Sequence, residues 1–104
     1  MLQVSTEFRK GVLFVRLVGR IDNEGYLESI DSIIEKFGIQ YIVLNLNDLI
    51  DVSLDSIDHI INYHKKILKK KKNLLICDSN YVRNRLFKGI IPNIRCELEA
   101  FSLI

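Results

Sequence analysis

One strand, helix and strand in the middle of the chain limit its possible folds more than any other feature. The segment 41–46 (YIVLNL) is short, rich in β-branched residues and mostly apolar, which is typical of a strand covered on both faces. After it, apolar residues recur at helical spacing, and the segment 73–77 (NLLIC) has the composition of another strand. A helix that connects two strands of one sheet forms a parallel, right-handed crossover. The pattern therefore predicts a sheet with 41–46 near its centre.

A hairpin and a helix are predicted on the N-terminal side of this unit. The segments 2–8 and 12–19 have the composition of strands, and Gly11 between them suits a turn. A helical stripe of apolar residues comes next, and Gly38 follows it as a C-terminal stop. The stripe consists of Leu27, Ile30, Ile34 and Phe37. We expect this helix to bury one face.

The C-terminal region adds one helix and one strand to the prediction. In the segment 80–87, Val82 and Leu86 share a predicted buried face, and Pro92 comes after the end of the helix. The tail 94–104 has the pattern of a short last strand. The full order, β-β-α-β-α-β-α-β, places the chain in the α/β class, as a mixed sheet with helices packed against it.

Length and composition favour one domain, residues 1–104. The chain has 104 residues, 48% of them hydrophobic, and a formal net charge of +2. This is enough for one compact core and too little for two. No apolar run approaches the roughly 20 residues of a membrane-spanning helix, and the first residues lack the order of a secretory signal. We expect a cytoplasmic location and no contact with membranes.

The residue types that usually carry chemistry are sparse. Cys77 and Cys96 lie in apolar segments without C-x-x-C spacing, so we expect both to be buried hydrophobes. His59 and His64 are separated by about 140° around a helix and cannot face one metal ion; His64 should be partly buried. Nucleophile turns and glycine-rich phosphate loops are absent from the sequence. The sequence predicts no metal, no cofactor and no enzymatic activity.

A lysine-rich run at 64–73 (HKKILKKKKN) suggests nucleic acid as one possible partner. No aromatic residue lies among these lysines to stack on bases, and the whole chain has a net charge of only +2. Lysines in the last turn of a helix complement the helix dipole. We interpret the run as a solvated helix end, and direct binding of nucleic acid as the weaker alternative.

The residues around the central strand carry a family resemblance. Residues 41–67 (YIVLNLNDLIDVSLDSIDHIINYHKKI) follow, without a gap, the pattern of an apolar strand, Asp-Leu, three residues, Asp-Ser-Ser-Gly-Leu and an apolar helix. Asp48 and Leu49 match the Asp-Leu pair. Residues 15–22 (VRLVGRID) and 73–87 (NLLICDSNYVRNRLF) are similar to two further segments of the same family. Over nearly its whole length, the chain resembles the STAS domain of bacterial anti-sigma factor antagonists.

This resemblance implies a partner and a switch. In such antagonists, a serine at the start of the second helix is phosphorylated by a partner that is both anti-sigma factor and kinase. The unmodified antagonist binds that partner, and the added phosphate, with about −1.5 to −2 charges, ends the binding. On the gapless match the acceptor position falls on Leu54, which cannot take a phosphate. Shifting the motif by one or two residues makes Ser53 and Ser56 the candidates for phosphorylation.

The acidic segment itself has two interpretations. In one, Ser53 is a helix N-cap and Asp55 complements the helix dipole, which is compatible with any function. In the other, Asp51, Asp55 and Asp58 give the loop and the first turn a permanent negative field, so that the chain resembles an antagonist fixed near its phosphorylated state.

The leading prediction is a regulatory, protein-binding module of the anti-sigma factor antagonist class. The expected partner is an anti-sigma factor with serine kinase activity, or a related signalling protein, which meets the loop and the outer face of the helix after it. The expected contact residues are Asp48, Asp51, Ser53, Leu54, Asp55 and Ser56. The alternative is a degenerate STAS domain that acts as a non-switching scaffold in a signalling complex.

Overall fold

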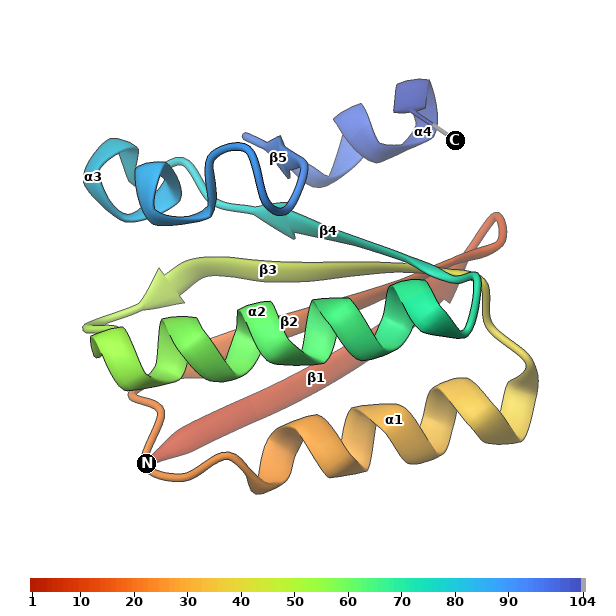
Figure 1. Cartoon of the computed structure of the whole chain (residues 1–104), viewed down its shortest axis with the longest axis horizontal. Helices are drawn as coiled ribbons and strands as arrows, with labels where there is room; N and C mark the ends of the chain where they lie inside the picture. Colours follow the sequence, from red (N-terminus) through yellow and green to blue (C-terminus); the bar gives the residue numbers. More distant parts are fainter. Residues whose placement is uncertain (104) are drawn as a thin grey trace.

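The computed structural model describes residues 1–103 and contains one five-stranded sheet with helices on both faces (Figure 1). The strands are β1 (Leu2–Arg9), β2 (Val12–Gly19), β3 (Tyr41–Leu49), β4 (Asn73–Cys77) and β5 (Asn93–Ile94). They lie in the order β1-β2-β3-β4-β5. The first pair is antiparallel and every later pair is parallel. The predicted mixed sheet, with the segment 41–46 at its centre, is confirmed.

Two long helices, α1 (Gly25–Phe37) and α2 (Leu54–Lys69), lie side by side on one face of this sheet (Figure 1). Between β4 and residue 103 the helical elements are short. These are α3 (Tyr81–Asn84), η1 (Arg85–Phe87), η2 (Glu97–Glu99) and α4 (Ala100–Leu103). One face of the sheet is therefore covered by the two long helices.

Local sequence explains where these elements begin and end. Lys10 and Gly11 have φ angles of 50° and 84°, the two positive values that a two-residue type I′ hairpin turn requires. Gly38 has a φ of 61°, and its N–H donates to the carbonyl of Ile34, which ends α1 as predicted. α2 ends inside the lysine run at Lys69, but the run is only partly solvated, because Lys72 is 9% exposed and Lys70 pairs with Glu35 at 2.7 Å.

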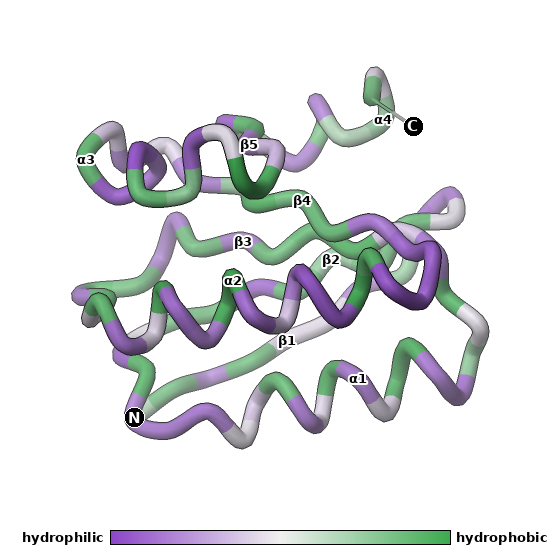
Figure 2. Tube along the Cα trace, viewed as in Figure 1, coloured by the Kyte–Doolittle hydropathy of each residue, from purple (hydrophilic) through white to green (hydrophobic). Residues whose placement is uncertain are grey.

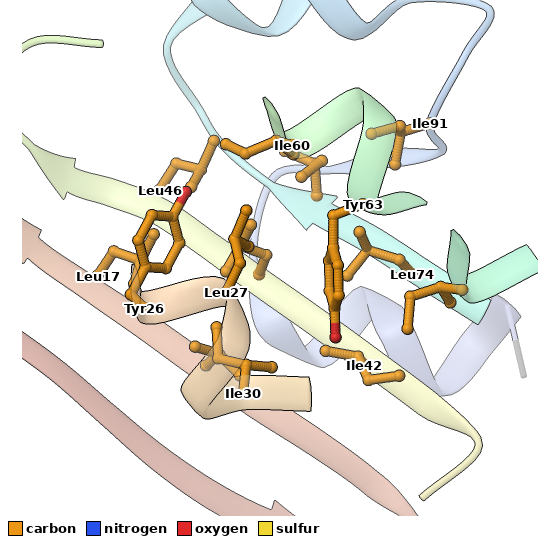
Figure 3. Close-up of a cluster of buried hydrophobic side chains, with 14 of the residues drawn as sticks. Leu17, Tyr26, Leu27, Ile30, Ile42, Leu46, Ile60, Tyr63, Leu74 and Ile91 are labelled. Carbon is orange, nitrogen blue, oxygen red and sulfur yellow. The ribbon is translucent and has the colours of Figure 1, made fainter. Parts of the chain in front are cut away.

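The main core lies between the two long helices and the sheet (Figure 3). Colouring by hydropathy shows the strands β3 and β4 as mainly hydrophobic and the two long helices as alternating, which is the pattern of helices that bury one face (Figure 2). A smaller cluster covers the opposite face of the sheet. Its members are Val12, Phe14, Val43, Leu75, Cys77, Ile94 and Ala100. The central strands are therefore covered on both sides.

The predicted buried face of the third helix is wrong by one residue. Val82 and Leu86 are exposed, whereas Arg83 and Phe87 are buried. Arg83 points inward because it forms an ion pair with Asp78, which is completely buried. A search for apolar periodicity does not consider an arginine as a core residue, so the sequence pattern selected the wrong face.

The predicted last strand is much shorter than expected. β5 has two residues, and residues 97–103 form η2 and α4 instead; residue 104 lies outside the described residues. The ring of Phe101 meets the ring of Phe14 edge-on, with centroids 5.7 Å apart. Ala100 and Phe101 thus cover the sheet from a helical turn rather than extend it as a strand.

Three single-residue expectations have different outcomes. Cys77 is buried as predicted, but Cys96 is exposed directly before η2, so the prediction for the second cysteine was wrong. His64 is buried at 5% exposure, and its loss of solvent lowers its pKa. Phe37 is 67% exposed at the end of α1 and does not belong to the core. The helical stripe therefore ends one turn earlier than predicted.

An ionic cluster holds the tail to the sheet. The guanidinium of Arg16 on β2 donates to both carboxylate oxygens of Glu97, at 2.7 and 2.8 Å, and to Glu7 at 2.7 Å. The side-chain amide of Asn45 on β3 donates to Glu97 at 2.9 Å. The hydrogen bond from Arg16, followed by the one from Asn45, lowers the pKa of Glu97. Three elements are thus connected through one carboxylate.

Replacing Glu97 by glutamine should remove a pH-dependent part of the stability. The pKa of Glu97 is lower in the folded chain, so its contribution is complete above the unfolded value of 4.5 and is lost as the pH falls through the lowered value. At neutral pH we expect the free energy of unfolding of Glu97→Gln to be about 1 to 2 kcal/mol lower than that of the native chain. Urea unfolding across the acid range should show this difference shrinking. Glu99→Gln, on the same turn, is the control, and a difference independent of pH would contradict the assignment.

Candidate functional site

The predicted binding segment lies at the edge of the sheet where β2 and β3 end. The two strands are parallel, and Gly19 pairs with Leu49 at their carboxyl ends. The N–H of Ile50 donates to the carbonyl of Gly19 at 2.8 Å. Gly19 has a φ of 100°, and a Cβ at this position would lie 2.5 Å from the carbonyl oxygen of Met1, so only glycine fits. The loops after β2 and β3 are therefore held together as one surface.

Serine side chains fix the start of α2. Ser53 has an extended backbone, and its Oγ accepts the N–H of Ser56 at 3.1 Å, which confirms the predicted N-cap. The Ser53 hydroxyl donates to the Oγ of Ser56 at 3.1 Å, and the Ser56 hydroxyl donates to Oε1 of Glu24 at 3.3 Å. Glu24 directly precedes α1. A chain of hydrogen bonds therefore connects the starts of the two long helices.

Glu24 is the charged centre of this connection. Its Oε1 lies 3.6 Å from Nδ1 of His59, which in turn lies 2.7 Å from the carbonyl oxygen of Asp55. Its Oε2 and the hydroxyl of Tyr26 are buried without a hydrogen-bond partner among residues 1–103. Burial, and secondly the charge of Glu24, raise the pKa of Tyr26. The tyrosine therefore stays neutral beside the carboxylate.

The six predicted contact residues differ in their access to solvent. Five are exposed, namely Asp48, Asp51, Ser53, Leu54 and Asp55. Ser56 is only 5% exposed. Asp51 forms an ion pair with Arg20 at 3.2 Å, but both side chains are more than half exposed, so the pair adds little stability. The structure thus places five of the six where a partner can reach them.

A buried ion pair between Asp78 and Arg83 holds the end of β3, from which the exposed segment continues. Asp78 follows β4, and its carboxylate accepts hydrogen bonds from Nε and Nη2 of Arg83 at 2.6 and 3.0 Å. The same guanidinium donates to the carbonyl oxygens of Leu46, at 2.8 Å, and Leu49, at 3.4 Å. A planar guanidinium can satisfy these acceptors together, whereas an ammonium cannot. The end of β3 is therefore fixed just before the exposed segment begins.

A groove of about 450 Å³ lies between α1 and α2 and shares His59 with the site. Glu28 and Asp31 lie on its α1 side and Lys66 on its α2 side. The hydroxyl of Tyr63 donates to Asp31 at 3.1 Å, and burial, followed by the charge of Asp31, raises the pKa of Tyr63. The walls carry charges of both signs, so the groove does not favour a ligand of one charge.

Sequence reasoning did not identify Glu24, Asp78 or Arg83 as parts of the site. A signal for Glu24 was present in the sequence. The carboxyl ends of neighbouring parallel strands lie at the same edge of a sheet, and residues 15–22, which are similar to a segment of the family, lead directly into the loop that contains Glu24. No comparable signal marked Asp78 and Arg83, since a buried ion pair interrupts the apolar pattern on which core predictions depend. Among residues 1–103, no helix has the length and apolar character needed to cross a membrane.

Proteins of one regulatory class resemble the chain in sequence and in structure. The anti-sigma F factor antagonist of Paenibacillus polymyxa is 31% identical over 88 residues, which are 82% of this chain and 75% of that protein. No family model matches the chain. The structure of the anti-sigma factor antagonist SpoIIAA in its unphosphorylated form has a TM-score of 0.77 at 14% identity, covering 99% of this chain and 96% of that one. An anti-sigma factor antagonist from Mycobacterium paratuberculosis has a TM-score of 0.78 at 14% identity, covering 100% and 94%.

The two structures establish the fold, and the curated relative establishes the family. A mixed sheet with α2 starting at the carboxyl edge of β3 defines the STAS fold in this chain. The identity to the Paenibacillus protein extends over most of both chains. The chain belongs to the anti-sigma factor antagonist family, as the sequence predicted.

Loss of Arg83 should destabilise the fold strongly. Arg83→Met leaves the buried carboxylate of Asp78 without its charged partner, which we expect to cost about 3 to 5 kcal/mol. Adding Asp78→Asn removes the unpaired charge and should recover part of this loss. The exposed neighbour Arg85 provides a matched control, because Arg85→Met should change little. Urea unfolding of the four proteins measures the effect, and a double variant no more stable than Arg83→Met would argue against the ion pair.

Proposed function

We propose that the chain is an anti-sigma factor antagonist that binds an anti-sigma factor of the kinase type through residues 48–56 and the outer face of α2. Family membership supports this, since the curated relative is named as an antagonist of an anti-sigma factor. The observation that carries the proposal is Leu54, which is 69% exposed at the first position of α2. An apolar side chain surrounded by exposed carboxylates has the composition of an interface with an apolar centre and a polar rim.

Ser53 is the better candidate for phosphorylation of the two serines. Its side chain is exposed, whereas Ser56 is 5% exposed and donates its hydroxyl to Glu24. A phosphate on Ser56 would lie against that negative carboxylate, which is unfavourable. A phosphate on Ser53 would lie at a helix N-terminus, where free N–H groups and the dipole favour an anion. We therefore assign the switch of this proposal to Ser53.

Exposed aspartates give the proposed contact surface a negative charge before any phosphate is added. Asp48, Asp51, Asp55 and Asp58 are all exposed around the start of α2. Of these, Asp51 has a nearby cation in Arg20. Like charges across an interface oppose binding, and opposite charges speed association. A phosphate on Ser53 would add to this negative field, which is the change that the switch of this proposal requires.

A non-switching scaffold is the second candidate function, and Leu54 favours it as well. This leucine occupies the position that accepts phosphate in the family motif. A scaffold would use the same surface, but treatment with the partner kinase would leave its binding unchanged. Phosphate mapping on the bound chain therefore separates the two functions.

The proposal also keeps the cytoplasmic location that the sequence predicts. Both cysteines, Cys77 and Cys96, are free thiols. Unpaired cysteines fit a compartment in which thiols stay reduced.

Truncation of Leu54 should weaken binding of the anti-sigma factor without loss of stability. The partner is first identified by a tagged pull-down from the source organism, with mass spectrometry of the bound proteins and of phosphate on the bait. Calorimetric titration of Leu54→Ala with this partner should then show an affinity about tenfold lower than that of the native chain, since an exposed apolar contact is removed. Leu98→Ala is the matched control, because Leu98 is 70% exposed and lies in η2, outside the proposed surface. Equal affinities of the two variants would contradict the proposed surface.

Restoring the family residues should strengthen binding, provided that the negative field acts as a partial phosphate mimic. The double change Leu54→Ser and Asp55→Ser introduces a hydroxyl and removes a charge from the first turn of α2. We expect its affinity for the unmodified, kinase-type partner to rise severalfold, because the surface becomes closer to that of an unphosphorylated antagonist. A titration that shows no gain in affinity would contradict the mimicry hypothesis. The proposed contact surface is tested separately by Leu54→Ala.

A further inference from the structure

The free edge of β1 is a long, unpaired row of backbone groups. β1 has eight residues, all paired with β2 in one continuous register. It is the first strand in the sheet order, so among residues 1–103 no strand pairs with its other edge. Native edges of this kind are usually protected by proline, an edge lysine, a bulge or a covering element. Residues 2–9 contain neither proline nor lysine, and their two charged residues are already engaged within the chain: Glu7 pairs with Arg16 and Arg9 lies over the ring of Phe14.

The hairpin turn decides which groups face this edge. In a two-residue type I′ hairpin the flanking residues, here Arg9 and Val12, form a hydrogen-bonded pair. Hydrogen bonds to β2 then recur at every second residue, which leaves the N–H and C=O groups of the even-numbered residues directed outward. These residues are Leu2, Val4, Thr6 and Phe8. The edge therefore offers a regular ladder to another strand.

The same residues carry exposed apolar side chains. Val4, Thr6 and Phe8 pair with Leu17, Val15 and Leu13 on β2, which belong to the main core. These three side chains of β1 therefore point to the face that α1 and α2 cover. Even so, Val4 is 41% and Phe8 is 60% exposed. Leu2 packs partly against the main core, but the helices leave the apolar side chains of Val4 and Phe8 exposed. An apolar edge ladder of this kind is suited to strand pairing rather than to water.

We propose that β1 pairs antiparallel with β1 of a second copy of this chain, about a two-fold axis at Thr6. In this register Val4 lies opposite Phe8 of the second copy, so the two exposed apolar residues meet. On the other face, Ser5 lies opposite Glu7, and Glu7 is already paired with Arg16 at 2.7 Å. No like charges lie directly opposite each other. The proposal does not rest on the function proposed above.

Neighbouring registers are less favourable for identifiable reasons. An axis at Glu7 would place two identical carboxylates opposite each other, which is destabilising. An axis at Ser5 would place Val4 opposite Thr6 and Phe8 opposite Leu2, so the two most exposed apolar residues would not meet. An axis between two residues would pair outward-facing with inward-facing backbone groups. Of the registers compared, only the Thr6 register satisfies the backbone, the apolar pairs and the charges.

The dimer has a defined geometry. The axis runs perpendicular to the sheet, so two five-stranded sheets become continuous and the long helices of both copies lie on the same face. Residues 48–56 follow β3, which is separated from the free edge by β2, and so they stay outside the interface. Pairing of one strand buries less area than a standard stable interface, so the dimer is expected to be reversible.

Disulfide trapping tests the register. In a Cys96→Ser background, Thr6→Cys brings two thiols to the axis, where the Cα atoms of a hydrogen-bonded pair lie about 5.5 Å apart, within the range of a disulfide. Ser5→Cys is the matched control, because its position lies opposite Glu7 rather than its own copy. Under mild oxidation we expect a covalent dimer from Thr6→Cys in large excess over Ser5→Cys. Equal trapping of both, stronger trapping of Ser5→Cys, or no trapping of either would overturn the proposal.

Sedimentation of unmodified chains tests whether the dimer forms without a crosslink. The native chain should show a sedimentation coefficient that rises with concentration toward that of a dimer. Thr6→Lys places two cations at the axis and should raise the dissociation constant about tenfold or more, whereas Ser5→Lys lies opposite Glu7 and should retain the dimer. Both residues are exposed, and circular dichroism checks that both variants fold. A native chain that stays monomeric, or equal weakening by both lysines, would reject the pairing.

Discussion

The pairing of Arg83 with Asp78 is the interaction on which the arrangement of the site depends. The guanidinium satisfies a fully buried carboxylate and, at the same time, two carbonyl oxygens at the end of β3. Without this guanidinium, the carbonyl oxygens of Leu46 and Leu49 at the end of β3 would lose a hydrogen-bond donor in a region that solvent does not reach. The short helix α3 is thus a support for the strand beside it. A buried ion pair is a costly way to gain stability, but it fixes geometry well when all its donors are used.

A fixed strand end makes the neighbouring surface ready to bind. The segment after β3 is held by the N–H of Ile50 on Gly19 and by the N-cap bond of Ser53. Binding energy is then not spent on ordering the loop. The hydrogen bond from Ser56 to Glu24 adds a second consequence, because it couples the start of α2 to the start of α1. A charge added at Ser53 would act on a rigid framework, so its effect would be mainly electrostatic repulsion rather than local unfolding.

Sequence reasoning succeeded where the physical signal was periodic and local. The hairpin, the two long helices and the central strand follow from apolar periodicity and from glycines at Gly11 and Gly38, which adopt the positive φ angles their positions require. It failed in the C-terminal third, where elements are only a few residues long and tertiary contacts decide. Arg83 turned inward for its ion pair, and the tail became helical because Glu97 and Phe101 contact the second face of the sheet. The N-cap at Ser53 was predictable, whereas its connection to Glu24 depends on contacts far apart in the sequence.

The two surfaces of the molecule have different physical origins, and this makes them independent. The surface at 48–56 arises from the carboxyl ends of parallel strands, where loops, a helix N-terminus and charges gather. The free edge of β1 arises because a hairpin adds an antiparallel strand whose outer edge pairs with no other strand among residues 1–103. A two-fold axis through that edge reverses the strand direction of the second copy. In the proposed dimer, residues 48–56 of the two copies therefore lie at opposite ends of the joined sheet but on the same face. A dimeric partner of matching span could bind both copies of this segment at once, which increases avidity.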